Sequence, residues 1–195
     1  MNPASILFAL IVLLLSSSLV AETYTSKYAG EEKRVTKSLS EADIQELQKG
    51  GGWGFAKVAE LNGYPGPAHI LQMQEQIGLT DEQRLKVQEL FDQMQKQAQT
   101  LGLKYIELET QLNDHFAEST IDSDLLLNLT QEIADVRAQL RRVHLQTHLQ
   151  TPLILTEDQI QNYNQLRGYS NNTDPCKNIP EGHSEVMWKK HHNCN

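Results

Sequence analysis

Residues 79–116 read LTDEQRLKVQELFDQMQKQAQTLGLKYIELETQLNDHF, the longest run without proline that keeps one apolar period throughout. Apolar side chains recur there in steps of three and four residues, at Val87, Phe91, Met94, Ala98, Leu101, Tyr105, Leu108, Leu112 and His115 or Phe116. This spacing predicts a long amphipathic helix that packs lengthwise against partner helices. A repeat of about 3.5 residues per turn also predicts a left-handed supercoil with those partners.

The start of this helix carries a capping box. Thr80 is placed to accept from the backbone N–H of Gln83, and the Gln83 side chain is placed to accept from the Thr80 N–H. The same Leu-Thr-x-x-Gln pattern returns at Leu155–Gln159, with Thr156 and Gln159 in the corresponding positions. We predict that Thr80, Gln83, Thr156 and Gln159 are structural caps, a role that capping boxes have in many helical proteins.

A second long helix follows a short link at 117–122. Asp122 or Ser123 is a suitable cap, and the helix reaches about Leu149 with its own apolar stripe at Leu126, Leu129, Ile133, Val136, Leu140 and Val143. So short a link predicts antiparallel neighbours, and hence a helical hairpin. Pro152 ends this helix, and the second capping box begins a last helix that Gly168 closes.

Shorter helices are predicted before the hairpin. Ser38 or Ser40 caps one that ends at the glycines 50–52, a second covers Trp53–Leu61, and a third runs from about Pro67 to Ile77. No strand-like alternation is long enough to compete with these helices. The predicted fold is therefore all-α, a long antiparallel helical hairpin with short flanking helices.

The N-terminus and the charge restrict the class of protein. Fifteen mostly apolar residues from Ile6 to Val20, followed by Ala21 and polar sequence, predict a signal peptide over 1–21 and hence export to the periplasm; a retained membrane anchor is the alternative. An arm with a short helix covers 22–52. The net charge of −8 argues against nucleic acid as a partner, because phosphates require a basic surface.

Paired side chains one helical turn apart are the candidate metal ligands. His144 and His148 on the second long helix lie on one face, at the edge of the apolar stripe, in the spacing that allows both imidazoles to bind one transition metal. Folding the hairpin about its link is expected to bring Glu89, Asp92 and Met94 near them. His69 and Met73 repeat the spacing on the helix before the first box. The alternatives are two ordinary groove histidines and, for Met73, a place in the core.

Residues 170–195 form a tail with both cysteines and no helical stripe. Cys176 and Cys194 are suited to a disulfide in an oxidising compartment. The alternative is a metal held by these cysteines together with tail histidines, a ligand set that suits Zn or Cu. The tail histidines are His183, His191 and His192.

The paired Leu-Thr-x-x-Gln boxes behind a signal peptide resemble the LTXXQ-motif family of periplasmic proteins, which includes the Spy and CpxP stress proteins and heavy-metal sensors. The stretches 59–67 (AELNGYPGP) and 166–169 (LRGY) resemble the heavy-metal sensor branch. The resemblance covers roughly Phe55 to Tyr169, within an LTXXQ-like helical domain predicted over 53–169. It implies a hooked hairpin, often a dimer with a concave face. The nickel and cobalt sensors of that branch use a His-x-x-x-His and a His-x-x-x-Met pair, in the reverse order along the chain.

These observations predict a non-enzymatic exported stress protein, because the sequence offers no nucleophile arrangement and no glycine loop after a strand. The first hypothesis is a metal-responsive sensor or heavy-metal tolerance protein of the Spy/CpxP-like family. It has no obligatory cofactor and binds a transition metal such as Zn, Cu, Ni or Co. The alternative is an ATP-independent chaperone that holds unfolded clients. The expected partners are a second copy of the chain, unfolded clients or a membrane sensor protein.

Overall fold

The computed structural model describes residues 24–169, Cys176 and residues 184–191, so the predicted signal peptide lies outside the described residues. The chain divides into two units, Met1–Glu32 and Lys33–Asn195. The described end of the first unit contains a turn in which the Tyr28 backbone N–H donates to Ser26 Oγ at 3.1 Å. A 3-10 helix, η1, spans Glu31–Lys33. None of the described helices has the length and apolar content that crossing a membrane would require.

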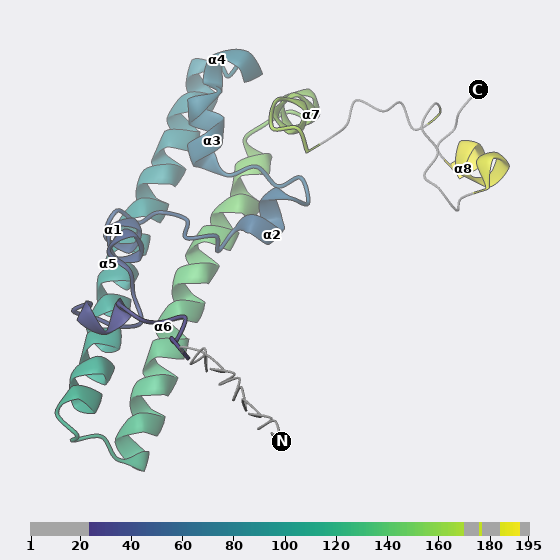
Figure 1. The fold of residues 1–195 in the computed structure, drawn as a ribbon. Coiled ribbons are helices and arrows are strands. Elements are labelled where there is room, and N and C mark those ends of the chain that lie inside the picture. Colours follow the sequence, from purple (N-terminus) through teal and green to yellow (C-terminus); the bar gives the residue numbers. More distant parts are fainter. Residues whose placement is uncertain (1–23, 170–175, 177–183, 192–195) are drawn as a thin grey trace, which may run out of the picture. The chain divides into compact units, whose positions relative to one another are not determined.

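Two long helices, α5 (Asp81–Ala117) and α6 (Ser123–Gln150), pack antiparallel as the predicted hairpin (Figure 1). Thr80 and Gln83 form the predicted capping box at the start of α5, and Asp122 caps α6 by accepting from the Leu125 N–H at 2.8 Å. These caps satisfy backbone donors that helix ends leave without partners. The prediction of an all-α hairpin is therefore confirmed.

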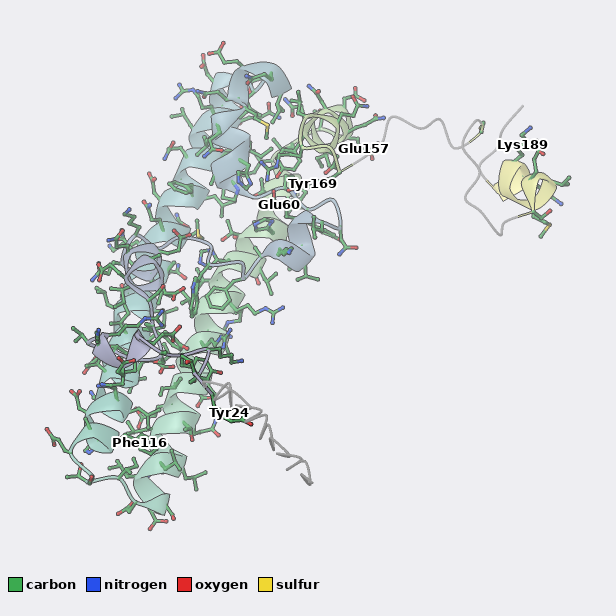
Figure 2. The ribbon with its side chains drawn as sticks, in the orientation of Figure 1. Tyr24, Glu60, Phe116, Glu157, Tyr169 and Lys189 are labelled. Atoms are coloured by element: carbon green, nitrogen blue, oxygen red, sulfur yellow. The ribbon has the colours of Figure 1, made fainter. Side chains whose placement is uncertain are left out.

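The apolar stripes of α5 and α6 meet in a core that runs along the hairpin, and α1 (Glu41–Gln48) covers part of α5. Gly102 allows this close crossing, because a Cβ atom at that position would lie 2.4 Å from the Leu47 carbonyl oxygen. Phe116, which the period assigned to the stripe, is 57% exposed because it lies at the free end of the hairpin (Figure 2).

A second apolar cluster closes the other end of the hairpin. Its buried members are Ile70, Ile77, Val87 and Tyr163. They come from α3 (Pro67–Gln72), α4 (Gln74–Ile77), the start of α5, and α7 (Glu157–Leu166), which follows α6 through the 3-10 helix η2 (Thr151–Leu153). Helices α3, α4 and α7 therefore gather at the end of the hairpin where the two capping boxes begin α5 and α7.

Three helix predictions are wrong in detail. The helix predicted over Trp53–Leu61 is only α2 (Lys57–Glu60), because Trp53 and Gly54 have φ angles of 41° and 72° and form a turn. The helix predicted over Pro67–Ile77 breaks at Met73, where φ is −110° and ψ is 21°, and the turn leaves α4 against α7. A helix that the sequence did not predict, α8 (Glu185–His191), lies in the tail and has an ion pair between Lys189 and Glu185 at 2.7 Å.

Candidate functional site

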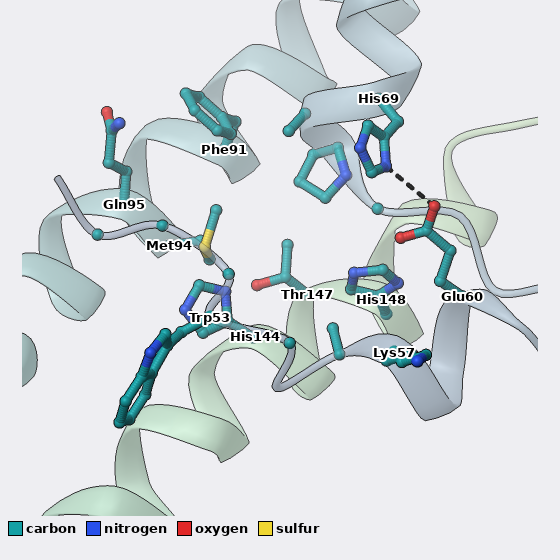
Figure 3. A pocket seen from close by; sticks show the side chains of 18 of the residues that line it. Trp53, Lys57, Glu60, His69, Phe91, Met94, Gln95, His144, Thr147 and His148 are labelled. Atoms are coloured by element: carbon teal, nitrogen blue, oxygen red, sulfur yellow. Dashed lines mark ion pairs between the residues drawn. The ribbon is translucent and has the colours of Figure 1, made fainter. Parts of the chain in front are cut away.

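A pocket of about 570 Å³ lies beside the hairpin, where α2, α3 and their connectors cover α5 and α6 (Figure 3). Three of the predicted ligands, His69, His144 and His148, line it together with Met94 and Thr147. Glycines 50–52, Trp53, Phe91 and Pro67 supply much of the rest of its wall. The fold thus brings the histidine of α3 and the two histidines of α6 to one cavity.

His148 is held by the connector that precedes α3. Its Nδ1 lies 2.7 Å from the Tyr64 carbonyl oxygen, and its side chain is buried. A carbonyl oxygen can only accept, so Nδ1 carries the proton, and in the neutral ring Nε2 carries a lone pair. That Nε2 packs against Gly66, where a Cβ atom would approach it to 2.6 Å.

His144 is 4% exposed and stacks on Phe55, with the two ring centroids 6.0 Å apart. Burial, with a smaller contribution from His148, lowers the pKa of His144 to about 4, although Glu46 and the Gly51 backbone act in the opposite direction. The ring is therefore neutral at neutral pH. Its Nε2 is buried and has no hydrogen-bond partner. A buried polar atom without a partner is costly in a folded protein, which makes this nitrogen a candidate ligand atom.

His69 is oriented by a carboxylate. Its Nδ1 lies 3.1 Å from Glu60 Oε1. Burial lowers the pKa of His69; Glu60 opposes this shift, while Arg167 and His148 add to it. The neutral ring donates from Nδ1 to Glu60, because an ionised carboxylate only accepts. Such a carboxylate–histidine pair is the usual support of a histidine that binds a metal through its other nitrogen.

Glu60 Oε1 also accepts from three groups at the C-terminal end of the described domain. Arg167 Nη2 and the Tyr169 hydroxyl lie 2.7 Å away, and the Tyr163 hydroxyl lies at 3.1 Å. Figure 2 shows Glu60 and Tyr169 next to each other. Burial alone would raise the pKa of Glu60, but the hydrogen bond from Tyr169, the neighbouring His69 and Arg167 lower it overall. The carboxylate is thus ionised and joins α2, α3 and the end of α7.

The sequence placed His144 and His148 at the edge of the stripe, as a half-exposed pair. The structure buries both, because the connectors around α2 cover this part of α6 with Phe55 and Gly66. Met73 does not line the pocket but packs against the second apolar cluster. In the tail, Cys176 is disulfide-bonded, whereas His183, His192, Cys194 and the side chain of His191 lie outside the described residues.

The sequence did not identify Glu60 and Tyr64, which hold His69 and His148. It also did not identify the groups that hold Glu60, namely Tyr163, Arg167 and Tyr169. The sequence nevertheless contained a signal for four of these residues. The stretch 59–67 contains Glu60 and Tyr64, and the stretch 166–169 contains Arg167 and Tyr169. These are the two stretches that carried the resemblance to heavy-metal sensors, and the structure joins them at the Glu60 carboxylate.

The described residues contain no group of three or more His, Cys, Asp or Glu side chains positioned to hold one metal ion. The donors themselves suit a transition metal, since His69 and His148 each have Nδ1 bound to an acceptor and His144 has an unpartnered Nε2. A metal in this pocket would therefore need fewer than three of these donors, or donors of another type.

A family model described as "LTXXQ motif family protein" matches residues 67–167, more than half of the 195-residue chain. This range includes both capping boxes, the whole hairpin and four predicted metal ligands, His69, Met73, His144 and His148. No curated protein and no solved structure matches the chain. Proteins of the matching family are usually periplasmic stress proteins and are generally non-catalytic. The chain belongs to the LTXXQ motif family.

Proposed function

We propose that this protein is a metal-responsive sensor or heavy-metal tolerance protein of the periplasm, and that it binds a transition metal in the pocket beside the hairpin. Its action is non-enzymatic. The observation that carries the proposal is the unpartnered Nε2 of His144, a neutral and buried imidazole nitrogen that lines the same pocket as His69 and His148.

The surroundings of the histidines support this proposal. His69 and His148 both have Nδ1 bound to an oxygen acceptor, which fixes the ring orientation and leaves Nε2 as the nitrogen available to a metal. His69 belongs to α3, whereas His144 and His148 belong to α6. A metal bound from both helices would hold the α2–α3 segment on the hairpin. Such a ligand-dependent restraint is a means of signalling, because it favours one arrangement of these elements over others.

The test is calorimetric titration of the oxidised full chain with Zn, Ni, Co, Cu(II) and Ag(I), compared with the variant His144→Ala/His148→Ala. We expect the parent to bind at least one of these metals and the double variant to bind it at least about tenfold more weakly. The matched control is His115→Ala, since His115 lies on α5 outside the pocket and is bonded to Thr120 Oγ1.

Binding by the tail is separated from binding by the pocket with a further full-chain variant, His183→Ala/His191→Ala/His192→Ala. The proposal expects this variant to retain the affinity of the pocket. Equal binding by the parent and the His144→Ala/His148→Ala variant, or no binding by either, would overturn the assignment of a metal to the pocket. Circular dichroism of each variant establishes that a loss of binding is not a loss of helix.

An ATP-independent chaperone is the second candidate, and exposed apolar side chains on the hairpin favour it. These are Leu85, Leu103, Phe116, Leu127 and Leu149, each more than half exposed. Apolar side chains on a helical surface can hold the apolar segments of an unfolded client. The test is suppression of the aggregation of a heat-unfolded protein, with Leu103→Gln/Leu127→Gln expected to weaken it. Unchanged suppression by this variant, or none by the parent, would exclude this surface as the client site.

A further inference from the structure

The pocket that contains His144 also contains a second kind of donor. Met94, from α5, is 8% exposed, and its thioether lines the pocket together with His144 of α6 (Figure 3). Met94 and Thr147 also line a second pocket of about 350 Å³ between the same two helices. Met94 therefore has open space on two sides, and its flexible side chain has room to move its sulfur.

We propose that the ligand of this pocket is a soft monovalent metal ion, Cu(I) or Ag(I), bound by His144 Nε2 and the Met94 thioether. This inference deepens the proposed function and rests on it. Thioether sulfur is a soft donor that selects Cu(I) over the harder divalent ions, and neutral imidazole also suits copper. Cu(I) and Ag(I) accept low coordination numbers, so they do not require the group of three His, Cys, Asp or Glu side chains that the described residues lack.

Charge favours the same ion. The donors at His144 and Met94 are neutral, and the Glu60 carboxylate in the pocket wall already accepts four hydrogen bonds through Oε1. The lining also contains two cationic side chains, Lys49 and Lys57, and one further carboxylate, Glu46. Burying a cation without anionic ligands is costly, and the cost rises steeply with its charge. A monovalent ion is therefore favoured over Zn, Ni or Co at these two donors.

The experiment measures Ag(I) and Cu(I) affinity of the oxidised full chain by competition with a chromophoric chelator under anaerobic conditions. Ag(I) is the primary probe, because it needs no reductant and so leaves the disulfide of Cys176 intact. The variant is Met94→Leu, which conserves volume and removes the sulfur. We expect it to weaken Ag(I) and Cu(I) binding about tenfold or more and to leave any Zn binding unchanged.

Met73→Leu is the matched control, since Met73 packs in the second apolar cluster and does not line the pocket. It should bind Ag(I) like the parent. A direct readout uses selenomethionine protein, in which absorption at the selenium edge should show a silver neighbour in the parent and in Met73→Leu but not in Met94→Leu. This measurement detects the bond itself, so it does not depend on equal stability of the variants.

The outcomes separate this inference from the proposed function. Equal Ag(I) affinity of the parent and Met94→Leu, or the absence of a selenium–silver neighbour in the parent, would overturn the inference. If His144→Ala/His148→Ala then still lost metal binding, the proposed function would stand with a different ligand set. If that variant bound every metal as the parent does, the proposed function and the inference would both fail.

Discussion

The side chains of Gln83 and Gln159 hydrogen-bond each other in both directions, with Nε2 of each residue donating to Oε1 of the other at 2.8 and 3.0 Å. Each Oε1 also accepts from the threonine N–H of its own capping box. Each Nε2 also donates to a carbonyl two residues before the opposite threonine, Ile154 for Gln83 and Gly78 for Gln159. The two copies of the motif are therefore one symmetric contact between the starts of α5 and α7.

This contact predicts that Gln83→Glu is destabilising. An ordinary capping box accepts Glu or Gln at this position, so a simple cap would tolerate the change. Here Nε2 must donate to the Ile154 carbonyl and to Gln159, and a carboxylate cannot donate. We expect a loss of about 1–3 kcal/mol in the free energy of unfolding, measured by urea denaturation. The control is Gln161→Glu, which adds the same charge at an exposed position of α7. Equal effects of the two changes would mean that the boxes act as separate caps.

The threonines of the boxes have the simpler role that the sequence predicts. Thr80 Oγ1 and Thr156 Oγ1 each accept the backbone N–H of the glutamine three residues later, at 3.2 Å. Thr80→Ala and Thr156→Ala should each lower the free energy of unfolding by about 1 kcal/mol. Metal titration of the same variants should match the parent. A variant with normal stability and lost function would instead identify the boxes as binding features.

The pH dependence of stability should include a contribution from Asp43, which closes the capping box of α1. It accepts from Ser40 and from Trp53 Nε1, the latter at 2.8 Å, and these bonds lower its pKa below the ordinary value of 3.8. Because the folded state favours the ionised form, Asp43 stabilises the protein above about pH 3.8 and this stabilisation is lost as the pH falls below that value.

Urea denaturation of the parent and Asp43→Asn at pH 6 and pH 3 checks this prediction. The variant should be less stable than the parent at pH 6 by about 1 kcal/mol, the cost of a lost cap, and the difference should shrink at pH 3. Glu132→Gln, at an exposed acid of α6, is the control and should show no such change. A difference that is constant between the two pH values would contradict the role assigned to the Asp43 charge.

The helices were predictable where local residues determine them, and the remaining features depend on contacts between distant parts of the chain. Thr80, Asp122 and Thr156 cap helices as predicted, because a cap and its partner are three residues apart. The positive φ of Trp53 accompanies packing on Tyr105 and a bond to Asp43, neither of which a local pattern contains. For the same reason the sequence drew attention to the histidines that line the pocket but not to the Glu60 carboxylate that gathers α2, α3 and α7 around them.

The oligomeric state remains a prediction, and we expect a homodimer. Leu85, Leu103, Leu127 and Leu149 leave apolar surface on the hairpin that a second copy would cover. Analytical ultracentrifugation of the full chain at micromolar concentration should give the mass of a dimer. Sedimentation as a monomer at that concentration would contradict the predicted dimer. The exposed leucines would then favour the alternative in which this surface binds unfolded clients.

The last prediction concerns Gly66, which lies against His148 in the pocket. The backbone of Gly66, with φ of −92° and ψ of 150°, suits any residue, so alanine introduces no backbone strain. Its Cβ, however, would lie 2.6 Å from Nε2 and 2.7 Å from Cε1 of His148, and the ring would have to move. Gly66→Ala should therefore weaken the bond between His148 Nδ1 and the Tyr64 carbonyl and cost about 1–3 kcal/mol of stability.

The matched control is Gly52→Ala, because Gly52 lines the same pocket and a Cβ there would meet no atom within 4 Å. Urea denaturation and metal titration of both variants form the test. We expect Gly52→Ala to match the parent in both measurements and Gly66→Ala to bind metal about tenfold more weakly, as is usual when the support of a metal-binding histidine is disturbed. If Gly66→Ala retained full metal affinity while losing stability, His148 would act only in packing, and His144 would hold the metal with Met94 or His69.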